Sequence, residues 1–202
     1  MKQKKDISDI ATIPNCGKCI TIDNCIDNIE QYDLDSMFTR DLNKNTTEWP
    51  DKHDHFVIDQ YKPIDLTKQL GDEILDKVRA YDKDFPKEIK GSYGAHEIRH
   101  HNGQNKLGDN WIGGIAPHSD RGWYVGITLF LNREWRKEWG AWNYIFNDND
   151  GIDINVPKFN RAIVLYAPRL HGATIVFERD KVRRSLQIFM RNANDSDNQY
   201  WW

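Results

Sequence analysis

The sequence predicts a mainly β protein (α+β) whose core is a double-stranded β-helix, or jelly roll, with supporting helices. After Gly91 the apolar residues fall into many short segments bounded by Gly, Asn and Asp, which is typical of an antiparallel β-sandwich or jelly roll. A single amphipathic pattern precedes these segments. Hydrophobic residues make up only 39% of the 202 residues, but the 12% of aromatic residues favour a packed core over disorder.

The helical pattern begins at residue 65 and is expected to extend to about residue 85. Apolar residues recur there at three- and four-residue spacing, and Asp65 is a plausible N-cap. A strand over 55–59 precedes this helix. The strands expected after it are 92–100, 111–118, 124–131, 142–146, 162–166, 173–177 and 183–190.

Residues 1–50 differ from the rest in composition and show little periodicity. We expect them to form a partly irregular N-terminal extension to a jelly-roll domain over 51–202. One short helix is predicted near 26–38. The extension holds the only cysteines, Cys16, Cys19 and Cys25. An odd number argues against a disulfide framework. A zinc site would need His53 or His55 as a fourth ligand, so reduced cysteines are the favoured interpretation.

The charge balance argues against nucleic acid as a partner, because 28 basic residues face 31 acidic ones and the net charge is −3. The apolar segments are too short to span a bilayer. The basic start, residues 1–6, is not followed by an apolar stretch, so a secretory signal is not expected. We therefore expect a cytoplasmic protein without a membrane segment, and the oligomeric state stays open.

His118, Asp120 and His171 form the candidate metal site and carry the predicted catalysis. His118 and Asp120 are two residues apart, so on an extended segment both side chains point the same way. Two His and one carboxylate can occupy one face of a ferrous ion and leave the opposite face open. A His-x-Asp pair is expected about once by chance in a chain of this composition. The weight therefore comes from its order with His171 and Arg183.

The stretch from about residue 115 to 191 resembles the catalytic core of the 2-oxoglutarate- and Fe(II)-dependent dioxygenases, and the prolyl 4-hydroxylase-like branch is the most similar. The segments that carry the resemblance are Pro-His-Ser-Asp at 117–120, Ile-Thr-Leu-Phe-Leu-Asn at 127–132 with Trp135, Gly-Ala-Trp at 140–142, Pro-Lys-Phe-Asn-Arg at 157–161, and His171 followed by Arg-Arg-Ser at 183–185.

This resemblance implies that His118, Asp120 and His171 bind Fe(II), with 2-oxoglutarate and O2 as cosubstrates. Arg183 and Ser185 share one strand face and would bind the distal carboxylate of 2-oxoglutarate, with Arg184 as the alternative to Arg183. The spacing from His171 to Arg183 is longer than usual, which implies an insertion in the 178–181 turn.

The resemblance implies a few substrate contacts. Phe130 replaces a Tyr that often assists cosubstrate binding in this family. Arg99 or His100 could stand in for a second Tyr and are, with Trp123, candidates for substrate binding. The group of His96, His100 and His101 could line the entrance of the site or form an exposed strand edge.

The implied activity is hydroxylation of an aliphatic carbon, foremost in a prolyl or other peptidyl residue. Asp120 favours hydroxylation over halogenation, since halogenating relatives lack this carboxylate. The alternatives are a nucleic-acid demethylase with the same iron chemistry, a hydroxylase of free amino acids or small metabolites, and a non-catalytic jelly-roll binding module. A family does not by itself fix the substrate.

Overall fold

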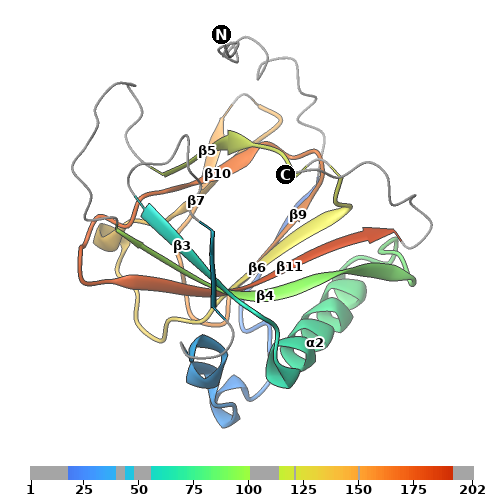
Figure 1. Ribbon diagram of the computed structural model, residues 1–202. Coiled ribbons are helices and arrows are strands. Elements are labelled where there is room, and N and C mark those ends of the chain that lie inside the picture. Colours follow the sequence, from blue (N-terminus) through green and yellow to red (C-terminus); the bar gives the residue numbers. More distant parts are fainter. Residues whose placement is uncertain are drawn as a thin grey trace, which may run out of the picture.

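Two antiparallel β-sheets face each other and enclose the interior of the molecule (Figure 1). The computed structural model describes residues 18–39, 44–47, 56–100, 114–120, 122–149 and 151–192. Within them the larger sheet has the strand order β1-β9-β6-β11-β4-β3-β2, and the smaller sheet has the order β5-β10-β7-β8. Several neighbours in these orders, such as β1 and β9 or β5 and β10, are distant in sequence, as in a jelly roll, so the predicted fold class is confirmed.

The strands follow the expected apolar segments, with three additions. The larger sheet contains β1 (Cys19–Ile22), β2 (Lys44–Thr47), β3 (Phe56–Tyr61), β4 (Ile89–His100), β6 (Val125–Phe130), β9 (Ala162–Tyr166) and β11 (Val182–Asn192). The smaller sheet contains β5 (Gly114–His118), β7 (Asn143–Phe146), β8 (Ile152–Asn155) and β10 (His171–Thr174). Of these, β1, β2 and β8 are not predicted from the sequence.

Helix α2 (Asp65–Tyr81) packs on the outer face of the larger sheet, against β4 and β11. Its apolar stripe, which includes Leu70, Ile74 and Val78, is fully buried there. The helix begins one residue earlier than an N-cap at Asp65 would place it. Ile64 occupies the N-cap, and its backbone N–H donates to the hydroxyl of Thr67 at 3.2 Å. Asp65 is therefore the first helical residue, where its charge still suits the helix dipole.

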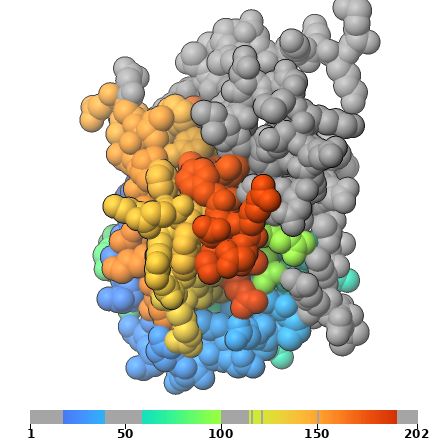
Figure 2. All heavy atoms as spheres, turned by 90° about the vertical axis from the view of Figure 1, so that its left-hand side faces the viewer, coloured from blue at the N-terminus to red at the C-terminus, as the bar shows by residue number. Residues whose placement is uncertain are grey.

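Residues 18–39 are built into the jelly roll, whereas the sequence indicated an extension attached to it. Strand β1 forms an edge of the larger sheet by pairing with β9. Two short 3-10 helices, η2 (Ile29–Gln31) and η3 (Leu34–Phe38), replace the single helix predicted there. Figure 2 shows this segment in blue, packed against the strands at the base of the molecule.

Asn160 fixes this segment to the rest of the chain. It adopts a left-handed conformation (φ 59°), which Asn tolerates better than most residues. Its side-chain amide accepts a hydrogen bond from the backbone N–H of Ile26 and donates one to the carbonyl of the same residue, both at 2.8 Å. A short polar side chain far along the sequence thus satisfies backbone groups of a buried turn.

Strand β11 separates two different environments. Its even-numbered apolar residues, Leu186, Ile188 and Met190, face outward into the core under α2. Arg183 and Gln187 face the opposite way, into the space between the sheets. The interior therefore has a polar lining on the larger sheet, and the candidate site lies there. A third 3-10 helix, η4 (Lys137–Trp139), precedes β7 at the edge of this space.

Candidate metal centre and carboxylate-binding site

The side chains of His118, Asp120 and His171 come together in the structure. One donor atom from each lies within 4.8 Å of the others. Nε2 of His118 is 3.6 Å from Oδ1 of Asp120, and Nε2 of His171 is 3.5 Å from Oδ2 of the same carboxylate. Two imidazole nitrogens and one carboxylate thus converge on a single point, which is the donor set expected for a ferrous ion.

Strand pairing in the smaller sheet creates this convergence. Strands β5 and β10 are antiparallel neighbours, and His118 lies directly opposite His171 in their register. Asp120 follows two residues after His118, where the backbone N–H of Trp123 donates to the carbonyl of Asp120 at 3.2 Å. Beneath its carboxylate lies Gly126 of β6, at which a Cβ would come within 3.0 Å of Oδ2. A side chain at this position would require the carboxylate to shift by a few tenths of an ångström.

His171 is held in the orientation that a metal ligand needs. Its Nδ1 is 3.0 Å from the carbonyl oxygen of Arg169. A carbonyl only accepts, so Nδ1 carries the hydrogen and Nε2 keeps its lone pair for a metal. Burial lowers the pKa of His171, against an opposing contribution from Asp120. Both effects of the surroundings, the fixed tautomer and the burial, favour the neutral ring that coordinates a metal.

Arg183 is a buried cation that has no carboxylate partner among the described residues. It is 2% exposed. Its Nη1 donates to the carbonyl of Ala141 at 3.1 Å and to Oδ1 of Asn143 at 2.8 Å, while its Nε has no hydrogen-bond partner in the described part of the chain. Burial lowers its pKa to about 10, which leaves the guanidinium charged at neutral pH. An uncompensated buried charge is costly, so this group is suited to an anionic ligand.

Polar residues continue from Arg183 along the inner face of the larger sheet. Ser185 is fully buried and its hydroxyl accepts a hydrogen bond from Gln187 Nε2 at 3.1 Å. The Gln187 carbonyl accepts in turn from the hydroxyl of Thr128 at 2.8 Å. The Phe130 ring lies 5.5 Å from the Arg183 guanidinium carbon. The sequence did not predict that Gln187, Thr128 and Asn143 contribute to this polar lining. Gln187 could have been predicted, because it alternates with Arg183 and Ser185 on the same face of the strand.

The other residues proposed from the sequence are placed differently. Trp123 packs against Phe189 of β11, with ring centroids 5.7 Å apart, on the same side as the metal-ligand candidates. Arg99 lies on the outer face of β4 and pairs with Asp59 at 2.7 Å, so the structure does not bring it to the site. His100 ends β4, and its side chain lies outside the described atoms. His101 and Cys16 lie outside the described residues.

Arg184 lies on the opposite face of β11 from Arg183. Its Nε donates to the buried carboxylate of Glu97 at 2.9 Å, and its Nη1 donates to Asp35 at 2.6 Å. Its guanidinium lies over the ring of Phe38, 4.8 Å from the centroid. The guanidinium of Arg184 is thus already paired, and it joins the 3-10 segment η3 to the sheet.

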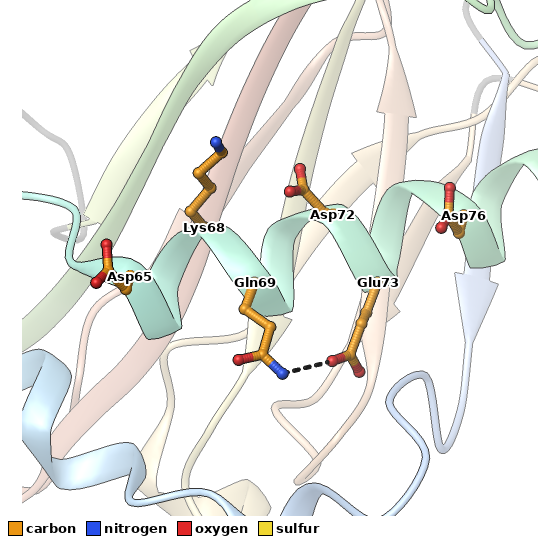
Figure 3. A pocket seen from close by; sticks show the side chains of 6 residues that line it. All are labelled: Asp65, Lys68, Gln69, Asp72, Glu73 and Asp76. Atoms are coloured by element: carbon orange, nitrogen blue, oxygen red, sulfur yellow. Dashed lines mark hydrogen bonds between the residues drawn. The ribbon is translucent and has the colours of Figure 1, made fainter.

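A shallow acidic hollow lies on α2, on the outer side of the larger sheet and away from the candidate site (Figure 3). Its lining residues are Asp65, Lys68, Gln69, Asp72, Glu73 and Asp76. The carboxylates of Asp72 and Glu73 accept hydrogen bonds from the hydroxyls of Tyr93 and Tyr32, both at 2.8 Å. These contacts give Asp72 and Glu73 a structural role, and we assign no ligand to the hollow.

The two halves of the interior fit the two groups that the sequence resemblance implies. The His118, Asp120 and His171 donor set suits Fe(II). Arg183, whose buried Nε has no hydrogen-bond partner among the described residues, suits a carboxylate such as the distal one of 2-oxoglutarate. The described residues contain no second cluster of three metal-ligating side chains with this geometry.

Comparison with solved structures shows the fold. The chain is similar to a prolyl-4-hydroxylase of Pseudomonas putida, with 13% identity over 93% of this chain and 97% of that one and a TM-score of 0.60. It is also similar to a prolyl hydroxylase of Trichoplax adhaerens solved with a peptide fragment of hypoxia inducible factor, with 12% identity over 86% and 83% of the chains and a TM-score of 0.63.

A third similar structure is HygX of Streptomyces hygroscopicus with nickel, 2-oxoglutarate and hygromycin B bound, with 10% identity over 98% and 90% of the chains and a TM-score of 0.60. No protein-family model and no curated sequence matches the chain. The chain therefore has the fold of 2-oxoglutarate- and Fe(II)-dependent oxygenases. Among the described residues, none of the helices has the length and apolar character needed to cross a membrane.

Proposed function

We propose that this protein is a non-haem Fe(II)- and 2-oxoglutarate-dependent dioxygenase that hydroxylates an aliphatic carbon. The carrying observation is one interior that holds both a His-Asp-His donor set and a buried arginine without a carboxylate partner among the described residues. A binding module without catalysis would have no need of all three metal-ligating side chains, His118, Asp120 and His171. Side chains from three segments remote in sequence converge here, which argues against a chance cluster.

Each group has a role that follows from its surroundings. His118, Asp120 and His171 would hold Fe(II), which when bound supplies the chemistry that couples O2 and 2-oxoglutarate to C–H hydroxylation. Arg183 would bind the distal carboxylate, and the hydrogen bonds from its Nη1 to Ala141 and Asn143 fix the direction of the guanidinium. Ser185 keeps its hydroxyl hydrogen available for the same carboxylate, because its oxygen accepts from Gln187.

The leading substrate class is a prolyl or other residue of a peptide. The support is the similarity in fold to prolyl hydroxylases, one of which was solved with a peptide fragment. The aromatic pair of Trp123 and Phe189 would form an apolar wall beside the metal centre for an aliphatic side chain. Small molecules are the second class, since HygX was solved with hygromycin B.

The first experiment is an anaerobic titration of the purified protein with Fe(II) and then 2-oxoglutarate. The expected result is the weak visible charge-transfer band of a metal-chelated 2-oxo acid. The variant His171→Ala should lack this band because it loses a metal ligand, and its Fe(II) affinity should fall by more than about 100-fold, as for a lost first ligand. Far-ultraviolet circular dichroism of both proteins verifies that the variant is folded.

Arg183→Met is the matched variant at the other end of the interior. It should bind Fe(II) like the parent and lose most of its response to 2-oxoglutarate. A folded parent that binds Fe(II) but shows no band with 2-oxoglutarate would contradict the enzyme proposal and favour a binding module. If the band forms, a screen of prolyl peptides for succinate release and a mass gain of one oxygen identifies the substrate class.

A further inference from the structure

His96 faces the same interior space as Arg183. On β4 it lies opposite Ser185 of β11 and Gln60 of β3, whereas its neighbours Ala95 and Glu97 are buried on the outer face. Arg183 lies opposite Ile98, so His96 is its diagonal neighbour on the inner face of the sheet. Diagonal neighbours on one face of an antiparallel pair are within reach of long and aromatic side chains.

The hydrogen-bonding capacity of this histidine is not used within the described residues. Neither ring nitrogen of His96 makes a hydrogen bond there. The side chain is not fully covered, and it points to the inner side of the sheet. Burial, and then the positive charge of Arg183, lower the pKa of His96 to about 3. At neutral pH the ring is therefore uncharged and offers one N–H donor beside the guanidinium.

The neighbouring side chains explain why a donor is needed at this position. The residue packed against the guanidinium of Arg183 is Phe130, whose ring carries no hydroxyl. A carboxylate bound to Arg183 has lone pairs beyond those that one guanidinium fills. Ser185 offers one hydroxyl hydrogen, and the two groups that Arg183 itself contacts, the carbonyl of Ala141 and the amide oxygen of Asn143, are acceptors.

We infer that His96 is a cosubstrate-binding residue of this chain, whose ring N–H donates to the carboxylate that Arg183 binds. This inference rests on the proposed function. It names a hydrogen-bond donor that lies outside the sequence motifs on which the family resemblance depends. It also assigns a role to one member of the histidine group at 96–101, for which the sequence left two interpretations open.

The test compares the parent, His96→Phe and His96→Gln in anaerobic titrations of the Fe(II)-loaded proteins. Phe keeps an aromatic ring but has no donor, whereas Gln keeps a donor. We expect His96→Phe to bind 2-oxoglutarate about tenfold more weakly, which corresponds to about 1.4 kcal/mol, and His96→Gln to recover most of this loss. Calorimetric titration with Mn(II) should give the same metal affinity for all three proteins, since His96 is not in the metal-ligand set.

A second ligand separates a direct contact from a general disturbance of the site. 2-Oxopentanoate has the same chain length as 2-oxoglutarate and lacks the distal carboxylate. Its affinity should be equal in the parent and in His96→Phe, because the proposed hydrogen-bond acceptor is missing. An equal loss for both 2-oxo acids, or no loss for 2-oxoglutarate, would overturn the inference while leaving the proposed function intact. A parent that does not respond to 2-oxoglutarate would overturn both.

Discussion

The two faces of strand β11 are both buried and yet have opposite chemistry. On the outer face, Leu186 and Ile188 are fully covered by the core that includes α2. On the inner face, Arg183 and Ser185 are covered to the same degree, although burial of polar groups disfavours folding unless they are partnered. The outer face therefore stabilises the fold. The buried polar side chains of the inner face are accounted for by ligands that would bind in the interior.

The largest effect on stability is expected from the outer face. Leu186→Ala removes a fully buried side chain beneath α2 and should lower the free energy of unfolding by about 2–5 kcal/mol. Chemical denaturation of the parent and the variant measures this change. At a temperature where the variant is folded, its Fe(II) affinity should equal that of the parent, and a parallel loss of both would remove the distinction between the faces.

Arg183 and Arg184 allow the sharpest test of the comparison, because they are adjacent residues of the same type whose side chains lie on opposite faces of β11. Arg183→Met should weaken 2-oxoglutarate binding by about 100-fold, which is the size expected for losing a charge-assisted pair. Its free energy of unfolding should change little, since the substitution removes a buried charge that has no carboxylate partner in the described part of the chain. Binding is measured by the anaerobic titration and stability by denaturation.

Arg184→Met should give the reverse pattern. It leaves the buried carboxylate of Glu97 without its cation, which should lower the free energy of unfolding by about 1–3 kcal/mol. Its affinity for 2-oxoglutarate should equal that of the parent. If Arg184→Met shows the cosubstrate defect instead, the assignment of the two faces is off by one residue.

A smaller effect is expected at the contact between the sheet and the metal centre. Gly126→Ala places a methyl group 3.0 Å from Oδ2 of Asp120, so the carboxylate must move by a few tenths of an ångström. We expect Fe(II) affinity to fall by about tenfold, as for the loss of a supporting contact to a ligand. Gly94→Ala is the control, because its methyl group would meet His96 and not Asp120. Calorimetric metal titration of both variants decides whether the effect is local.

The last effect depends on pH and concerns the acid stability of the metal-free protein. Burial lowers the pKa of His96 from 6.5 to about 3, so between these values the unfolded chain binds a proton that the folded chain does not. Stability should therefore fall as the pH falls through this window, by up to about 1.4 kcal/mol per pH unit from this residue. His96→Phe should show a shallower loss in denaturation at pH 4–6 than the parent. Equal slopes would mean that the ring is not buried in a low-dielectric interior.

Local pattern determined a large part of this protein. The apolar period fixed α2 and most strands, and strand β9 coincides with the expected range 162–166. The order of His118, Asp120, His171 and Arg183 along the chain indicated the candidate site before any contact was known. The helix and the strands could be predicted because each depends on residues two to four positions apart. The candidate site could be predicted because its separate segments follow one another in the order of a known family.

Other features depended on contacts between distant segments, which only the tertiary structure decided. Strand β1 exists because β9 offers an edge, and Asn160 fixes the turn that follows it. The side chain of Arg99 lies on the outer face of the sheet, away from the site, where it pairs with Asp59. His96 turned inward because β4 has a fixed register with β11, and a shift by one residue would have exchanged it with Glu97. The sequence contained these residues, but their burial and pairing were set by which strands became neighbours.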